Sequence, residues 1–191
     1  MPILGVVASG ISGNLANPAM DSIATYSGGA ASVITIGSIP STYKYLRLVA
    51  RLKDSRTPVA YSETKLTFNT TGGGLYGHTY LYGDSRGGPF EDSSSGSAGI
   101  PLSTPGTGTS SANVYSYTIL DIFDYQNTSK FTTVQGTSSY VDQGGPYLGG
   151  QAGVSVSATW ADTSTVTSII LTPNVANFGA NVRVSLYGIK G

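Results

Sequence analysis

The chain has 191 residues, a mass of 19.6 kDa and a formal net charge of zero, with ten Lys and Arg against ten Asp and Glu. This charge balance disfavours a DNA- or RNA-binding module, because nucleic-acid affinity depends on Lys and Arg side chains that neutralise phosphates. The sequence contains no Cys, which excludes disulfides, zinc–thiolate sites and thiol nucleophiles, and its length is that of one domain.

Short β-branched or aromatic runs, bounded by Gly, Pro and Asn, recur along the chain. They predict nine strands, over residues 31–36, 43–52, 64–69, 76–82, 114–123, 131–137, 151–159, 166–171 and 182–189. No long window shows the 3.6-residue period of a helix, because Gly, Ser and Thr interrupt every candidate. We therefore predict an all-β chain, folded over residues 1–191 as a single antiparallel β-sandwich of jelly-roll type.

The spacing of side chains predicts the surroundings of two of these strands. In the second run, Lys44, Arg47 and Arg51 do not alternate strictly with apolar residues, which indicates a β-bulge or an edge in solvent. In the last run, apolar residues occupy the even positions and alternate with polar or aromatic ones. We therefore expect Leu186 to be buried in the core.

A short apolar stretch lies within residues 1–20, which we expect to form an N-terminal arm. The stretch lacks the basic residues that open a secretory signal, and no run approaches the roughly 18 apolar residues of a membrane helix. We therefore expect neither export nor membrane insertion. The arm can reach a neighbouring subunit or add an edge strand to its own sheet, and both interpretations stay open. The apolar side chains concerned are Ile3, Leu4, Val6 and Val7.

Two further segments are rich in glycine. Residues 83–111 are dominated by Gly, Ser, Thr and Pro, and their number is too large for a hairpin connection. They predict a long loop, of the kind that is either functional or disordered. Residues 72–74 are three consecutive glycines, which predict a turn with positive φ rather than a phosphate-binding loop, because no helix follows them.

The sequence contains few residues of the types that act in catalysis or bind metal ions. His78 is the only histidine, so it cannot form a multi-histidine metal site, and no Gly-x-Ser-x-Gly motif supplies a nucleophile for it to activate. Asp121 and Asp124 are three residues apart in an expected strand, so they point to opposite faces and more plausibly close a turn than flank a sugar. We predict no catalytic residue, no cofactor and no metal ion, and thus a protein that is not an enzyme.

The tyrosine content points to a function in binding other proteins. The chain has 13 Tyr, and this side chain combines a large contact area with a polar tip, which suits protein interfaces. Two-residue alternation places Tyr76, His78, Tyr80 and Tyr82 on one face of their strand. The candidate interface residues are therefore Ile3, Leu4, Val6, Val7, Tyr76, His78, Tyr80, Tyr82 and Tyr147.

Several motifs together resemble a known family. The chain ends in Ser185-Leu186-Tyr187-Gly188-Ile189-Lys190-Gly191, preceded by Trp160-Ala161-Asp162 and the β-branched run that follows it. Further similar segments occur in the same order at residues 17–24, 39–46, 68–69, 121–130 and 177–179. Taken together, these segments resemble those of small structural proteins of tailed-phage virions. The resemblance implies a jelly-roll protein on the outside of the particle, attached to the capsid or the tail.

On this basis we expect a structural protein of the virion, made in the host bacterial cytoplasm, that decorates or cements the capsid. Its expected partners are further copies of itself, as a homotrimer, and the major capsid protein. The alternative is a tail-fibre or receptor-binding protein that recognises host surface glycans, and a less favoured third is a glycan-active enzyme.

Overall fold

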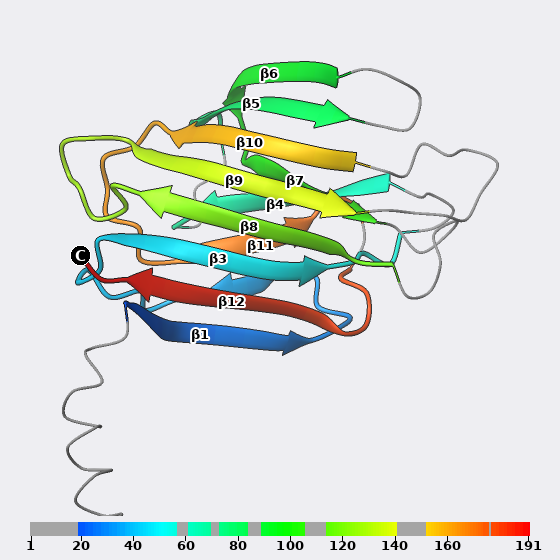
Figure 1. Cartoon of the computed structure of the whole chain (residues 1–191), viewed down its shortest axis with the longest axis horizontal. Helices are drawn as coiled ribbons and strands as arrows, with labels where there is room; N and C mark the ends of the chain where they lie inside the picture. Colours follow the sequence, from blue (N-terminus) through cyan, green and yellow to red (C-terminus); the bar gives the residue numbers. More distant parts are fainter. Residues whose placement is uncertain are drawn as a thin grey trace, which may run out of the picture.

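The computed structural model describes residues 19–56, 61–69, 73–83, 89–105, 114–140, 152–175 and 177–191. These residues form twelve strands and no helix (Figure 1). The strands are β1 (Met20–Gly28), β2 (Ile34–Ile36), β3 (Tyr45–Leu52), β4 (Tyr61–Phe68), β5 (Tyr76–Gly83), β6 (Pro89–Ser97), β7 (Ile100–Pro105), β8 (Ser116–Phe123), β9 (Thr132–Tyr140), β10 (Ala152–Trp160), β11 (Ile169–Pro173) and β12 (Val182–Ile189).

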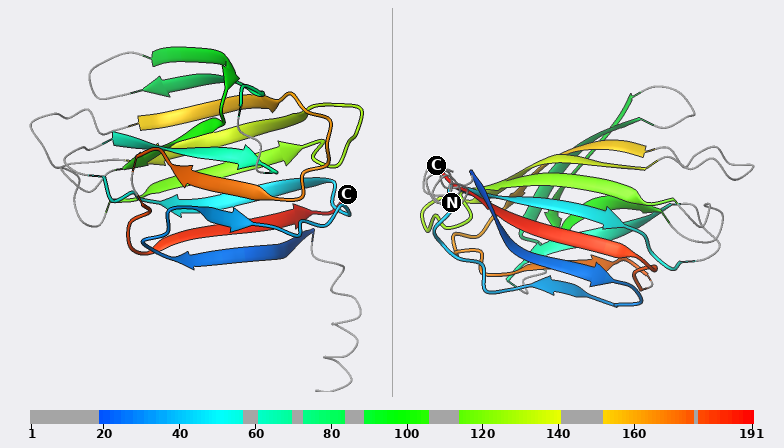
Figure 2. Two further views of the ribbon diagram at one scale, coloured as in Figure 1. Left: turned by 180° about the vertical axis from the view of Figure 1, so that it is seen from behind. Right: turned by 60° about the horizontal axis from the view of Figure 1, so that its bottom comes forward.

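The strands form two antiparallel sheets that pack face to face (Figure 2). The large sheet has the strand order β1-β12-β3-β8-β9-β10-β5-β6, and the small sheet has the order β2-β11-β4-β7. The prediction of an all-β chain folded as an antiparallel β-sandwich is therefore confirmed.

The connections between the sheets follow the jelly-roll order. Taken in chain order, β1, β2, β3, β4, β7, β8, β11 and β12 give the neighbours β1-β12-β3-β8 in one sheet and β2-β11-β4-β7 in the other. This nesting of first with last strand is the arrangement of two Greek keys. The other four strands are insertions: β5 and β6 between β4 and β7, and β9 and β10 between β8 and β11. Both insertions extend the large sheet beyond β8.

The extension packs against the small sheet through polar contacts as well as apolar ones. The Ser138 hydroxyl of β9 donates to the carbonyl of Ser103 in β7 at 3.2 Å. The Tyr80 hydroxyl of β5 donates to the carbonyl of Pro101, also in β7, at 3.2 Å. These bonds join β9 and β5 of the large sheet to β7 of the small sheet.

Strict alternation builds the core. In β3 every even residue from Leu46 to Leu52 is buried, and the odd residues lie on the other face. In β12 the side chain of Leu186 is fully buried, as predicted. Trp160 contributes the largest buried side chain, and its ring centroid lies 5.4 Å from that of Phe68.

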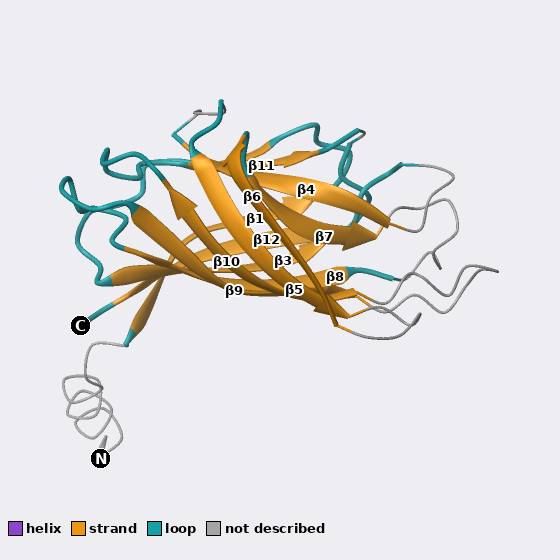
Figure 3. Ribbon diagram, turned by 90° about the horizontal axis from the view of Figure 1, so that it is seen from above, coloured by secondary structure: helices purple, strands orange, loops and turns teal. Residues whose placement is uncertain are grey.

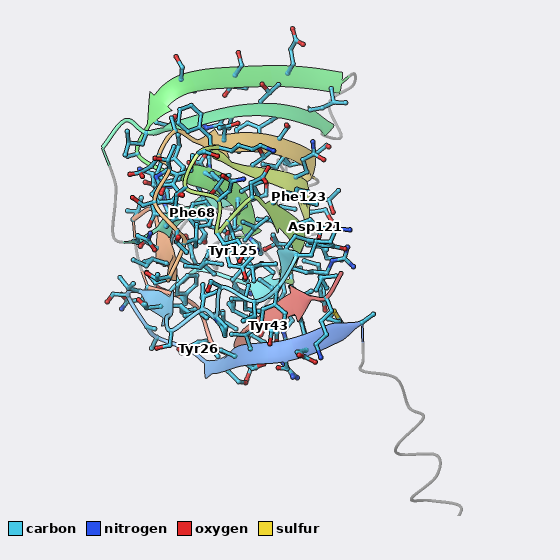
Figure 4. All side chains as sticks on the ribbon, turned by 90° about the vertical axis from the view of Figure 1, so that its left-hand side faces the viewer. Tyr26, Tyr43, Phe68, Asp121, Phe123 and Tyr125 are labelled. Carbon is cyan, nitrogen blue, oxygen red and sulfur yellow. The ribbon has the colours of Figure 1, made fainter. Side chains whose placement is uncertain are left out.

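One end of the sandwich is closed by tyrosines, and Figure 4 views the molecule from this end. The Tyr125 hydroxyl donates to the carbonyl of Pro40 at 2.7 Å and accepts from the backbone N–H of Tyr43 at 3.1 Å. The Tyr43 hydroxyl donates to Asp21 at 3.3 Å, and Lys190 forms an ion pair with the same carboxylate at 2.8 Å. Segments around residues 39–46, 121–130 and 185–191, which are far apart in the sequence, are thus joined to one another at this end of the sandwich.

The structure corrects three expectations about the strands. Most of the stretch predicted as a loop over residues 83–111 is ordered, because residues 89–105 form β6 and β7. The polar sequence of β6 hides this strand from pattern recognition, since an edge strand is stabilised by pairing with its neighbour rather than by apolar side chains. A strand over 20–28 was not predicted either, and it begins at the end of the proposed arm, of which residues 1–18 lie outside the described part of the chain.

The expected irregularity in the second predicted strand is also wrong. β3 is an interior strand between β12 and β8, and its pairing shows no register shift on either side. Arg47 and Arg51 share the outer face, and Lys44 precedes the strand. The predicted glycine turn is confirmed, because Gly73 and Gly74 have φ values of 105° and 83°.

Candidate interaction surface

The predicted tyrosine stripe lies in the core and not on the surface. Tyr76, His78 and Tyr80 share one face of β5, as alternation predicts, but this is the inner face, and all three are buried. The Tyr76 hydroxyl accepts the backbone N–H of Phe68 at 2.7 Å, and Tyr80 is bonded to Pro101 as described above. Their assignment as exposed interface residues is therefore wrong, because both polar tips find partners inside the protein.

The remaining predicted interface residues lie outside the described part of the chain, either wholly or by their side chains. The backbone of Tyr82 belongs to β5, but its side chain lies outside the described part. The others also lie outside the described residues, and they are Ile3, Leu4, Val6, Val7 and Tyr147.

His78 is held as a neutral ring. It stacks on Tyr80 with ring centroids 4.6 Å apart, and its Nδ1 atom is buried without a hydrogen-bond partner. Burial lowers the pKa of His78 and outweighs the opposite effect of Asp92 and Glu63. Within the described ranges, no three His, Cys, Asp or Glu side chains are grouped so that they could hold a metal ion.

Asp121 and Asp124 do not form a catalytic pair of carboxylates but have separate structural roles. Asp121 accepts two hydrogen bonds from Arg47, at 2.7 Å from Nε and 2.8 Å from Nη2. These bonds raise the pKa of Arg47, so the guanidinium stays charged. Asp124 has a φ of 55° and its carbonyl accepts the backbone N–H of Asn127 at 2.9 Å. The prediction of a turn is thus confirmed for Asp124, whereas Asp121 pairs across two strands.

The exposed side chains of interest lie on the outer face of β12, β3 and β8. The register places Val49 opposite Ile119, and Arg51 opposite Tyr117. Tyr117 is 62% exposed and Ile119 is 48% exposed. We call this surface the aromatic face, and its apolar and aromatic members are Tyr45, Val49, Tyr117, Ile119, Phe123 and Tyr187.

Arginine side chains surround these groups. Arg51 lies 4.9 Å from the centroid of the Tyr115 ring, and its guanidinium donates to the carbonyl of Asn181 at 2.6 Å and 3.1 Å. Arg183 is exposed on β12, directly opposite Arg51. Arg47 is neutralised by Asp121, so Arg51 and Arg183 leave the aromatic face with a positive charge. Exposed aromatic and aliphatic groups between arginines are typical of the central part of a protein interface.

A sequence signal for this surface exists. The predicted strands over 43–52 and 114–123 carry large apolar or aromatic residues at both odd and even positions. A strand whose outer face faces only water needs polar residues at every second position. The tyrosine-rich strand over 76–82, by contrast, carries Tyr76 and Tyr80 on its buried face.

The outer side of the inserted strands is chemically different. On β9 and β10 it carries hydroxyl and amide side chains and no charged one, namely Thr133, Gln135, Thr137, Ser139, Ser155, Ser157 and Thr159. Both regions belong to the large sheet, whose strands lie side by side from β1 to β6 in Figure 1. Figure 3 colours the strands orange and the loops that connect them teal.

Comparisons with protein-family models, with curated proteins and with solved structures find no match to this chain. The described residues include no helix of the length and apolar character needed to cross a membrane.

Proposed function

We propose that this chain is a structural component of a tailed-phage particle, and that it binds the capsid as a decoration or cement protein through its aromatic face. The observation that carries the proposal is this exposed surface of aromatic, aliphatic and arginine side chains on the eight-stranded sheet. The resemblance of the sequence motifs to small virion proteins supports the identity of the particle.

The chemistry of the aromatic face defines the partner surface. Tyr117 and Ile119 lose contact with water when they are covered, and burial of an apolar side chain contributes about 1.5–3 kcal/mol. The charge of Arg51 and Arg183 favours carboxylates on the opposing protein. The partner is therefore an apolar patch bordered by Asp or Glu, and we assign it to the major capsid protein.

Self-association is a separate part of the proposal. The chain as a whole has no net charge, so two copies do not repel each other at long range, and closed cyclic symmetry is the usual arrangement of identical subunits. We expect a homotrimer, so light scattering of the purified protein should give three times the chain mass of 19.6 kDa. A monomer at micromolar concentration, with or without capsid protein, would contradict this part.

The capsid contact is tested by incorporation into particles of the phage that encodes the chain. Tyr117→Thr combined with Ile119→Thr should lower the number of copies per particle at least about tenfold, the effect of about 1.4 kcal/mol of lost binding energy. Both residues are exposed, so the variant should melt at the wild-type temperature.

Leu81→Thr is the matched control, because Leu81 is an exposed aliphatic residue on the same sheet but on β5, away from the aromatic face. Its incorporation should equal that of the wild type. Wild-type incorporation of the double variant would refute the role of the aromatic face, and antibody labelling confined to the tail would refute binding to the capsid.

A further inference from the structure

A hollow of about 440 Å³ lies where β10, β5 and β6 adjoin. Alternation along these strands places most of its lining on the outer face, and those residues are Gly77, Thr79, Ser93, Ser95, Ser157 and Thr159. The rest of the lining is Ser94 and two residues with inward-facing side chains, His78 and Ala158, which are opposite each other in the register.

The hollow exists because of two local features of the sequence. Gly77 stands opposite Thr159 in the register and has no side chain to fill the space between β10 and β6. The pairing of β5 with β6 shifts between Tyr76 and His78, and Gly96 near this bulge has a φ of 72°. A bulge of this kind bends the strand and moves its side chains away from their neighbours.

The space above Gly77 is free of protein. A Cβ atom added at Gly77 would meet only the carbonyl oxygen of Ser94, at 3.8 Å, which is an ordinary van der Waals contact. A larger side chain therefore fits at this position without displacing the backbone, and it would occupy the hollow.

The lining selects the chemistry of a ligand. Six side chains of the lining carry hydroxyl groups, each of which donates and accepts hydrogen bonds, and none of the lining residues has a charged side chain at neutral pH. An ionic ligand would lose hydration without gaining an opposite charge, and an apolar ligand would leave the covered hydroxyls without partners. A neutral ligand with several hydroxyl groups avoids both costs, because it has no charge to desolvate and it can form hydrogen bonds with the hydroxyl groups that it covers.

We propose that this hollow is a binding site for a neutral saccharide, with room for one or two sugar rings. The hollow is shallow and open to solvent, so a bound sugar would contact the lining with one side and keep the other side in water. Since the lining hydroxyls exchange bonds with water for bonds with sugar, the net gain is small and we expect a dissociation constant of about 1 mM. The site lies on β10, β5 and β6 and does not depend on the aromatic face of β12, β3 and β8.

The experiment is a titration of the isotope-labelled full chain followed by NMR, with maltose, cellobiose and lactose as the neutral probes and glucuronic acid as the charged one. At least one neutral disaccharide should shift the amide signals of residues 77–79 and 157–159 in a saturable manner. Glucuronic acid should bind at least about tenfold more weakly, because its carboxylate finds no partner.

Two variants decide whether the hollow is the site. Gly77→Val places an isopropyl group in the part of the hollow between β10 and β6 and should weaken binding at least about tenfold, and Gly37→Val is the matched control because nothing lies within 4 Å of a Cβ atom at Gly37. Thr79→Val combined with Thr159→Val keeps the shape but removes two hydroxyls, and it should also weaken binding at least about tenfold. It provides an independent test if Gly77→Val does not fold.

Four results would overturn the proposal: no saturable shift with any neutral disaccharide, shifts that map to other residues, equal binding of the charged probe, or undiminished binding by the folded hollow variants. None of these results bears on incorporation of the Tyr117 and Ile119 variant into particles, so the failure of one proposal is distinguishable from the failure of the other.

Discussion

Replacing Gly188 by Ala should destabilise the protein, because the ring of Tyr43 occupies the place of the missing side chain. A Cβ atom at Gly188 would lie 2.3 Å from the Cγ and Cδ2 atoms of Tyr43. Two carbon atoms pack favourably at about 3.5–4.0 Å, so the ring would have to move by about 1.2 Å or more. The Tyr43 hydroxyl is bonded to Asp21, which opposes such a movement.

The size of the effect follows from the usual cost of overpacking, about 1–3 kcal/mol. For a chain of 191 residues each kcal/mol lowers the melting temperature by about 2–4 °C, so Gly188→Ala should lower it by about 2–12 °C. Circular dichroism during heating measures this change, and Gly37→Ala, at a position with open space, should leave the melting temperature unchanged.

A double-mutant cycle identifies the cause. Tyr43→Ala removes the ring, and in this background Gly188→Ala should cost less than about 0.5 kcal/mol, since nothing remains in its way. The reasoning would be refuted by an equal loss of stability from Gly188→Ala in both backgrounds, which would place the cost in the backbone of β12 rather than in the contact with Tyr43.

Three other expectations concern single residues. Leu186→Asp places an unpaired charge in the core at a cost of several kcal/mol, so circular dichroism should show no cooperative melting, and a cooperatively melting variant would contradict the burial of Leu186. Asn69→Ala removes four hydrogen bonds: Oδ1 accepts from the backbone N–H groups of Thr167 and Ser168, at 2.8 Å and 3.1 Å, and from the Thr167 hydroxyl, and Nδ2 donates to the carbonyl of Thr165 at 2.7 Å. It should cost at least about 1–3 kcal/mol in chemical denaturation. Because burial lowers the pKa of His78 below its unfolded value of about 6.5, the unfolded chain binds the proton first as the pH falls. Stability should therefore be constant above about pH 7 and decrease below about pH 6.5, by at most about 1.4 kcal/mol per pH unit, and this dependence should vanish between pH 5.5 and 7.5 in His78→Gln. A wild-type melting temperature that does not change over this pH range would contradict the burial of a neutral His78.

The aromatic face shows which features of a sheet can be predicted from sequence patterns and which cannot. Alternation in the strand over 43–52 separates Leu46 and Leu48 from Arg47 and Val49, but it says nothing about which strand lies alongside. Only the pairing of β3 with β8 brings Val49 opposite Ile119, residues that are 70 positions apart in the chain. A surface made by neighbouring strands therefore becomes visible only when the sheet order is known.

The sequence by itself determined the features that depend on local chemistry. Alternating apolar side chains require a buried face, which predicts the sandwich and the burial of Leu186, and consecutive glycines favour the positive φ found at Gly73 and Gly74. The tertiary structure decided whatever depends on partners distant in the chain. It turned the stripe of Tyr76 and Tyr80 inward, because the small sheet covers that side of β5, and it made the polar segment 89–97 a strand, because β5 supplies the hydrogen bonds. Period-two alternation separates two faces of a strand but does not say which of them meets another sheet, since that choice is made by contacts between segments far apart in the sequence.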